Sequence, residues 1–222
     1  PVRRAASVQW NNTWYIQGGF YSEFMSSFFS LDLSTNWTTS SPPWKSLPSG
    51  SVASHFALVA TKDGRIWSVG NGLKQEMFSV FNLSTNGPWQ ALPAGVPMYT
   101  RGLEGHAAVV VPNDDKIYIV GGFSNTTRAV AGSPLTFTTN LISVFQTTEP
   151  NAFVQPGPTQ AQTGTTSWND MGWAWLSKKQ VALFFGGTRA LPGAPVVPLG
   201  ALQQFVPSKN EWSTMMPKDP KW

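Results

Sequence analysis

The sequence predicts an all-β protein built from four similar four-stranded antiparallel sheets. Three observations support this fold class: a low charged content, a strand-and-glycine pattern that occurs four times, and a constant order of apolar segments around each copy. Only 12% of the 222 residues are charged, which is about half the usual share, while 20 Gly and 18 Pro favour strands and turns over helices. The hydrophobic content of 41% is enough for a sizeable core.

A run of strand-forming residues that ends in glycine occurs four times. The segments are NNTWYIQGG, KDGRIWSVGNG, DDKIYIVGG and SKKQVALFFGG, and their marker glycines are Gly18, Gly70, Gly121 and Gly186. Apolar residues after a polar turn indicate a buried strand, and the glycine supplies a positive φ or a close backbone approach. The markers are 52, 51 and 65 residues apart, so the chain contains a repeat.

Each copy contains the same four elements in the same order. An apolar strand comes first and forms a hairpin with the glycine-marked strand; its versions are AASVQW, HFALVA, HAAVVV and GWAWL. A third strand follows the glycines, as FFSLDLSTN, MFSVFNLSTN, NLISVFQTT and ALQQFVPSKN. The fourth element carries an aromatic residue, which is Trp44, Trp89, Phe153 or Trp212. These units occupy roughly residues 1–50, 51–100, 101–160 and 161–222.

The recurring tryptophans predict how the sheets pack. A single four-stranded sheet cannot bury both of its faces, so neighbouring sheets must cover one another. We expect the Trp44, Trp89 and Trp212 side chains to fill the gaps between adjacent sheets. Trp173 and Trp175 alternate along one strand, so we expect them to share a core face.

The pattern resembles a known repeat family. The segment HAAVVVPNDDKIYIVGGF, followed by a strand and an aromatic residue, looks like a kelch repeat, and nearly the whole chain is similar to the kelch-type or galactose-oxidase-type β-propeller. The resemblance implies one propeller domain over residues 1–222 with four visible blades. Because the family usually closes with more than four, it also implies that the chain is part of a larger propeller or that another chain covers its open faces.

Galactose oxidase suggests a catalytic alternative within this resemblance. Its copper site needs a Cys–Tyr cross-link, a second Tyr and two His, and this sequence contains no Cys. His55 and His106 each precede a marker glycine by 15 residues, so we interpret them as equivalent residues at the start of a strand and not as metal ligands. We therefore expect no catalytic residue, no metal site and no cofactor. A fragment of a carbohydrate oxidase, with its catalytic residues in missing blades, is the alternative.

Candidate ligand-binding residues lie just before the first strands of the repeats. In the propellers that the chain resembles, these positions line the central channel, so side chains from several copies could converge on a ligand there. The candidates are Arg101, Glu104, His106, Trp168 and Asp170. The alternative interpretation is that Arg and Glu at such positions pair between blades and hold the loops in place.

Four N-glycosylation sequons indicate passage through the secretory pathway. All lie in or beside predicted turns, where a sugar can project into water; their asparagines are Asn11, Asn36, Asn82 and Asn125. No apolar run is long enough for a membrane helix, and no signal peptide is visible. We expect a secreted or cell-surface protein whose signal peptide or membrane anchor lies outside this sequence.

The charge distribution argues against a nucleic-acid partner. The net charge is only +4, from 15 Lys and Arg against 11 Asp and Glu, and the basic residues occur singly or in pairs where nucleic-acid binding needs clusters. The leading hypothesis is a non-enzymatic module that binds a protein or a glycan through its loops. A structural surface protein that self-associates through exposed blade faces is a further alternative.

Overall fold

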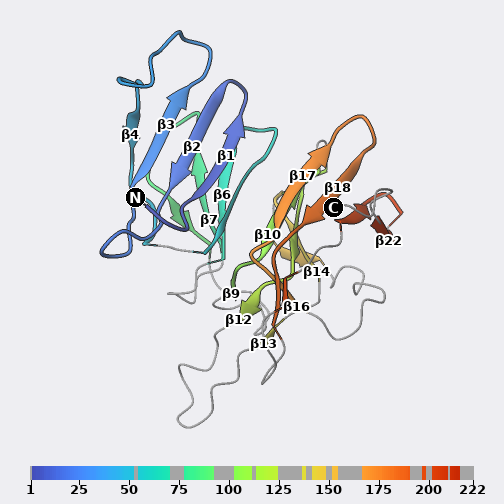
Figure 1. Ribbon diagram of the computed structural model, residues 1–222. Coiled ribbons are helices and arrows are strands. Elements are labelled where there is room, and N and C mark those ends of the chain that lie inside the picture. The colour runs from blue at the N-terminus through green and yellow to red at the C-terminus, as the bar shows by residue number, and fades with distance from the viewer. Residues whose placement is uncertain are drawn as a thin grey trace. The chain divides into compact units, whose positions relative to one another are not determined.

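The computed structural model confirms the predicted fold class. It describes residues 2–52, 55–70, 78–92, 103–111, 114–124, 137–138, 142–148, 152–154, 167–190, 197–198, 202–209 and 211–215. Every regular element within these ranges is a β-strand. The chain divides into two compact units, Pro1–Glu104 and Gly105–Trp222, and each unit contains two of the four-stranded sheets (Figure 1).

The first unit contains sheets 1 and 2, both antiparallel with strands in chain order. Sheet 1, blue in Figure 1, consists of β1 (Ala6–Trp10), β2 (Thr13–Gln17), β3 (Phe28–Asp32) and β4 (Lys45–Leu47). Sheet 2 consists of β5 (Ala57–Ala60), β6 (Arg65–Val69), β7 (Phe78–Asn82) and β8 (Gln90–Ala91). The short strand β9 (Leu103–Glu104) ends the unit.

The second unit contains sheets 3 and 4 and some additional strands. Sheet 3 consists of β10 (Ala107–Val110), β11 (Lys116–Val120), β14 (Ile142–Gln146) and β15 (Ala152–Val154). Sheet 4 consists of β17 (Gly172–Leu176), β18 (Val181–Phe185), β21 (Leu202–Val206) and β22 (Glu211–Met215). The sequence did not predict two sets of short strands: β12 (Phe123–Ser124) with β13 (Phe137–Thr138), and the sheet of β16 (Ser167–Asn169), β19 (Thr188–Ala190) and β20 (Val197–Pro198).

The marker glycines have the backbone conformation that the sequence predicts. Gly18, Gly70, Gly121 and Gly186 all have positive φ, between 63° and 78°. Gly19 shows a second reason for glycine, because it has a φ of 101° and an added Cβ would lie 2.8 Å from the carbonyl oxygen of Arg3. A side chain there would meet both a strained backbone and a steric clash.

Each unit has an apolar core between its two sheets. In the first unit, Ala6, Tyr15 and Phe28 of sheet 1 pack with Phe56, Leu58, Ile66 and Phe81. In the second, residues of sheet 3 such as Val109 and Tyr118 pack with Ala182, Phe184 and Phe205. Trp173 and Trp175 pack against this second core, which confirms that they share a core face.

The tryptophans of the fourth elements differ in their surroundings. Trp89 lies between the two sheets of the first unit, with its ring 5.1 Å from Phe28 and 5.5 Å from Phe81. Trp212 packs on Phe205 and Phe184 of its own sheet and against the second core. The prediction is wrong for Trp44, which is 40% exposed and contacts only Trp14 among the described aromatic rings. The reason is that Trp44 lies on the face of sheet 1 that points away from sheet 2.

Candidate functional site

The loops that lead into the four first strands share one backbone feature. The residue two positions before each of these strands has a left-handed conformation: Arg4, His55, Gly105 and Asp170, with φ between 56° and 64°. Positive φ is uncommon for residues other than glycine. Its recurrence at the same place in all four sheets shows that these loops turn into their strands by one shared geometry.

The structure corrects the equivalence of the two histidines. Ala57 of β5 pairs with Val69, and Ala107 of β10 pairs with Val120. The hairpin turn in sheet 3 is therefore one residue longer than the turn in sheet 2. Two residues that lie at the same distance before their marker glycines are for this reason one position apart relative to the first strands. His55 corresponds to Gly105, whereas His106 corresponds to the buried Phe56 and is itself buried. The prediction that the two histidines occupy the same position is wrong.

Glu104 makes a polar contact with His55 within the first unit. Its Oε2 atom lies 3.5 Å from Nδ1 of His55, and both side chains are largely shielded from solvent. Glu104 belongs to β9 and His55 to the loop before β5, so the contact joins two segments that are far apart in sequence. This is the loop-holding role that the sequence offers as the alternative to ligand binding.

Asp170 is positioned by a backbone hydrogen bond in the second unit. Its N–H donates to the carbonyl oxygen of Gly105 over 2.7 Å, which ties the loop before β17 to the loop before β10. The Asp170 side chain is exposed, whereas His106, next to Gly105, is buried. Of the predicted ligand-binding residues that the structure describes fully, Asp170 is therefore the one with a solvent-facing side chain at a strand start.

Three predicted residues are described only in part or not at all. Arg101 and Asn125 lie outside the described residues. Trp168 lies in β16, where its backbone pairs with Arg189, but its side chain is outside the described part of the chain. Among the candidates, the structure therefore shows a contact between Glu104 and His55 and a backbone hydrogen bond from Asp170 to Gly105.

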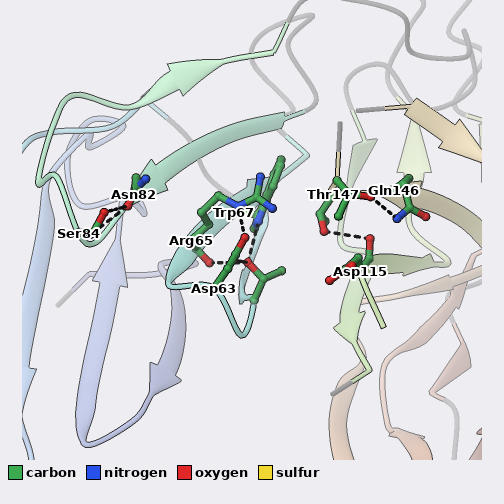
Figure 2. A network of polar contacts seen from close by, with 10 residues as sticks. Asp63, Arg65, Trp67, Asn82, Ser84, Asp115, Gln146 and Thr147 are labelled. Carbon is green, nitrogen blue, oxygen red and sulfur yellow. Dashed lines mark hydrogen bonds and ion pairs between the residues drawn. The ribbon is translucent and has the colours of Figure 1, made fainter. Parts of the chain in front are cut away.

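The three described sequon asparagines, Asn11, Asn36 and Asn82, are all exposed. Asn82 ends β7, and its Oδ1 atom accepts hydrogen bonds from the N–H and the hydroxyl of Ser84 at 2.9 and 2.8 Å (Figure 2). Asp32 ends β3 with the same turn, accepting from the backbone and hydroxyl of Ser34. Hydrogen bonds from Ser34 lower the pKa of Asp32. The turn is a local feature of the repeat and holds the Asn82 sequon in a defined, solvent-facing conformation.

A polar network that sequence reasoning missed lies in the hairpin turn of sheet 2 (Figure 2). Asp63 accepts hydrogen bonds from the Thr61 hydroxyl and from Nε of Arg65, at 2.5 and 2.6 Å. Trp67 donates its ring N–H to the Thr61 hydroxyl at 3.3 Å, and the Arg65 guanidinium lies 4.9 Å from the centre of the Trp67 ring. The run TKDGRIW, with polar residues before a buried tryptophan, is the signal that predicts such a turn.

The charges of this turn and of its counterpart in sheet 3 stabilise structure. Burial raises the pKa of Asp63, but hydrogen bonds from Thr61 and Arg65 outweigh it, so the net shift is downward. In sheet 3 the Tyr118 hydroxyl donates to Asp114 over 3.0 Å. Burial and the Asp114 carboxylate raise the pKa of Tyr118, so this phenol stays protonated at neutral pH. Both networks fasten a buried aromatic residue of the second strand to its hairpin turn.

The outer side of sheet 1 is a second feature that the sequence analysis missed. Strand register places one set of side chains opposite the core: Ser7, Gln9, Trp14, Ile16, Phe29, Leu31, Trp44 and Ser46, which we call the open face of sheet 1. The Trp14 and Trp44 rings lie 5.8 Å apart at an angle of 46°. Trp14, Trp44 and Phe29 are 37%, 40% and 36% exposed, so the face presents aromatic surface to solvent.

The described residues contain no group of three His, Asp or Glu side chains placed to hold a metal ion. Within the same ranges there is no helix with the length and hydropathy of a membrane span.

Comparisons with known proteins identify the fold but no family. No protein-family model matches the chain, and no curated protein matches it. Among solved structures, the structure of YjhT is similar over 99% of this chain and 67% of its own, with a TM-score of 0.70 and 17% sequence identity. The fold is of the β-propeller type. At this identity the similarity concerns the fold alone, and the YjhT chain extends by about a third beyond the matched part.

Proposed function

We propose that the chain belongs to a kelch-type β-propeller that acts outside the cell, secreted or at the cell surface, as a non-catalytic module that binds a protein or a glycan. The exposure of all three described sequon asparagines carries this proposal. N-glycosylation requires an asparagine that the transferase can reach and room for a bulky sugar, and turns at strand ends provide both. The fourfold glycine-marked repeat supports the kelch assignment.

The binding part of the proposal rests on the loops before the first strands. Their shared left-handed residue sits on a rigid sheet scaffold, which is where binding residues are commonly held. Asp170 offers an exposed carboxylate there, while Glu104 and His55 are paired. The exposed Asp170 carboxylate is therefore the described candidate side chain that we expect to contact a ligand at these loops.

Expression behind a signal peptide in a eukaryotic cell tests the extracellular assignment. We expect secreted protein whose mass falls after enzymatic removal of N-glycans, and a smaller fall for Asn11→Gln, Asn36→Gln and Asn82→Gln. Asn12→Gln is a matched control because it changes an exposed residue of the same turn and keeps the Asn11 sequon intact. Secretion of a chain that carries no glycan at any of these sites would contradict the proposal.

A metal and peroxide assay tests the non-catalytic assignment against the oxidase alternative. The purified chain is loaded with copper, dialysed, analysed for bound metal and incubated with galactose and related sugars. We expect no stoichiometric copper and no hydrogen peroxide above a buffer control. Stoichiometric copper together with sugar-dependent peroxide would overturn the non-catalytic assignment.

A further inference from the structure

The turn between β7 and β8 contains an asparagine that is followed by glycine. The run is STNG, residues 84–87, and Asn86 is exposed with a φ of 47°. Its backbone N–H donates to the carbonyl oxygen of Asn82 over 3.1 Å. Its side-chain amide forms no hydrogen bond with any residue that the structure describes. Asn86 is therefore held through its backbone, and its amide is open to reaction.

The peptide group between Asn86 and Gly87 lacks two features that protect an asparagine. The backbone nitrogen of the next residue can attack the side-chain carbonyl carbon of an asparagine and close a succinimide ring. A bulky next residue or a firmly hydrogen-bonded N–H opposes this attack. Gly87 has no Cβ, and among the described residues its N–H donates to the Thr85 hydroxyl at 3.4 Å, which is longer than a normal N–H···O bond. Asparagine is among the chemically labile residues of proteins, and here neither barrier is present.

The corresponding turn of sheet 1 provides a comparison within the same chain. Both turns follow the third strand and have the same hydrogen bonds, from a serine to the side chain and from a threonine hydroxyl to the backbone of the last strand residue. Asn36 is the exposed counterpart of Asn86, but its next residue is Trp37, whose large side chain hinders attack by the backbone nitrogen. The two turns therefore differ at the residue that controls the reaction.

We propose that Asn86 is a site of spontaneous deamidation through a succinimide formed with the backbone nitrogen of Gly87. The Gly87 nitrogen bonds to Cγ of Asn86, the Cγ–Nδ2 bond breaks, and ammonia leaves with the proton of the former N–H. Water then opens the ring at either carbonyl and gives aspartate or isoaspartate. The net reaction consumes one water, releases one ammonia and needs no oxidant or reductant. The inference goes beyond the proposed function and does not depend on it.

The reaction changes the charge and the backbone of this turn. A carboxylate replaces a neutral amide, so the net charge of +4 falls by one. In the isoaspartate product the backbone also becomes one carbon longer between β7 and Trp89, which packs against the core of the first unit. The product is therefore distinguishable from the unmodified chain by its charge as well as by its mass.

Incubation of the full, unglycosylated 222-residue chain at physiological temperature and mildly alkaline pH, followed by tryptic peptide mapping, tests the proposal. We expect the peptide with Asn86 to gain about 1 Da with time, the difference between an amide and a carboxylic acid. Asn36 is the internal control and should react at least about tenfold more slowly, because Trp37 hinders the attack. Cleavage after Lys74 separates Asn86 from Asn71, which is also followed by glycine but lies outside the described residues. Incubation in heavy-oxygen water marks the deamidation that occurs before digestion.

The variant Gly87→Ala separates this route from other sources of deamidation. Its Cβ would meet Thr85 Oγ1 at 3.5 Å and no other described atom within 4 Å, so the variant should keep the thermal midpoint of the original chain. The added methyl group should slow the reaction at Asn86 at least about tenfold. Gln90→Ala, at an exposed position of β8, is the control and should leave the rate unchanged. Asn86→Asp carries the charge of the product and marks its position in isoelectric focusing.

A free peptide of residues 83–90 sets the length of the experiment, which continues until this peptide has deamidated. Asn86 that is still intact in the folded chain at that time would overturn the proposal, because the turn would then prevent ring closure. A rate at Asn86 no higher than the rate at Asn36 would also contradict it. The same holds for a rate that Gly87→Ala leaves unchanged, because the glycine would then not control the reaction.

Discussion

Sheets 1 and 2 have nearly the same local structure and differ in what surrounds them. Their third strands end in the same turn, at Asp32 with Ser34 and at Asn82 with Ser84, and each carries one tryptophan at its fourth strand. Trp89 is packed against Phe28 of the neighbouring sheet, whereas Trp44 is exposed. Local sequence thus builds the same face twice, and the neighbouring sheet decides whether that face becomes core.

Sheets 1 and 2 also differ at one buried position of the second strand. Strand register gives Gln17 and Val69 the same place, each opposite the first residue of its sheet. Both side chains are completely buried. Neither polar atom of the Gln17 amide has a hydrogen-bond partner among the described residues. Sheet 1 therefore carries an energetic cost at a position where sheet 2 has a simple apolar contact.

The largest expected difference in stability is between replacement of Trp89 and replacement of Trp44. Trp89→Ala should lower the free energy of unfolding by about 3 kcal/mol, because it leaves a cavity beside Phe28 and Phe81. Trp44→Ala should cost about 1 kcal/mol or less, since the side chain is 40% exposed. Urea unfolding measures both losses. Equal losses would show that a neighbouring sheet does not determine the role of this tryptophan.

The next largest effect compares two glycines that follow the second strands of different sheets. Gly19→Ala should destabilise by about 2 kcal/mol, because φ is 101° and the new Cβ would lie 2.6 Å from Cγ1 of Val2. Gly186→Ala should cost about 1 kcal/mol, since its φ is 65° but nothing lies within 4 Å. Gly87→Ala, with only Thr85 Oγ1 nearby at 3.5 Å, is the control and should be nearly neutral. Thermal midpoints of the three variants rank these costs.

Replacement of Gln17 should stabilise the chain. Gln17→Met keeps the length of the side chain and removes two buried polar atoms, so we expect a gain of about 1 kcal/mol. The gain appears as a higher urea midpoint with an unchanged slope. Gln90→Met, at an exposed position of β8, controls for a general effect of methionine. A loss of stability at Gln17 would mean that the amide makes favourable contacts with solvent or with residues beyond those described.

The smallest effect concerns the hairpin turn of sheet 2, which contains the hydrogen bonds from Thr61 and Arg65 to Asp63. The corresponding turn of sheet 1 is a short turn at Asn11. The folded pKa of Asp63 lies below its ordinary value of 3.8, so its contribution to stability is complete above that pH and is lost as the pH falls through and below it. Asp63→Asn should therefore reduce the acid-induced loss of stability by less than about 1 kcal/mol, because the pair is partly exposed. Unfolding midpoints between about pH 6 and about pH 2.5 test this. An identical pH dependence in the variant would contradict it.

The first and second strands could be predicted closely from sequence, and part of the site could not. Alternation and marker glycines located β2, β6, β11 and β18 because period-two patterns and glycine act locally. The prediction that His55 and His106 are equivalent failed because the turn before β11 has one additional residue. The sequence gives no signal of this residue, so the distance from the marker glycine was misleading. The pairing of Glu104 with His55 also required the structure, since the two residues are 49 positions apart.

The sequence by itself determined the strands of the four four-stranded sheets, the turns at Asp32 and Asn82 and the side of each sheet on which a residue lies, because these depend on neighbours along the chain. Only the tertiary structure decided that Trp89 is packed and Trp44 exposed, and that Gln17 is buried without a polar partner among the described residues. Burial depends on which distant sheet lies against a face. The local features that the two sheets share cannot specify that difference, because both sheets have a tryptophan at the fourth strand and the same turn after the third strand.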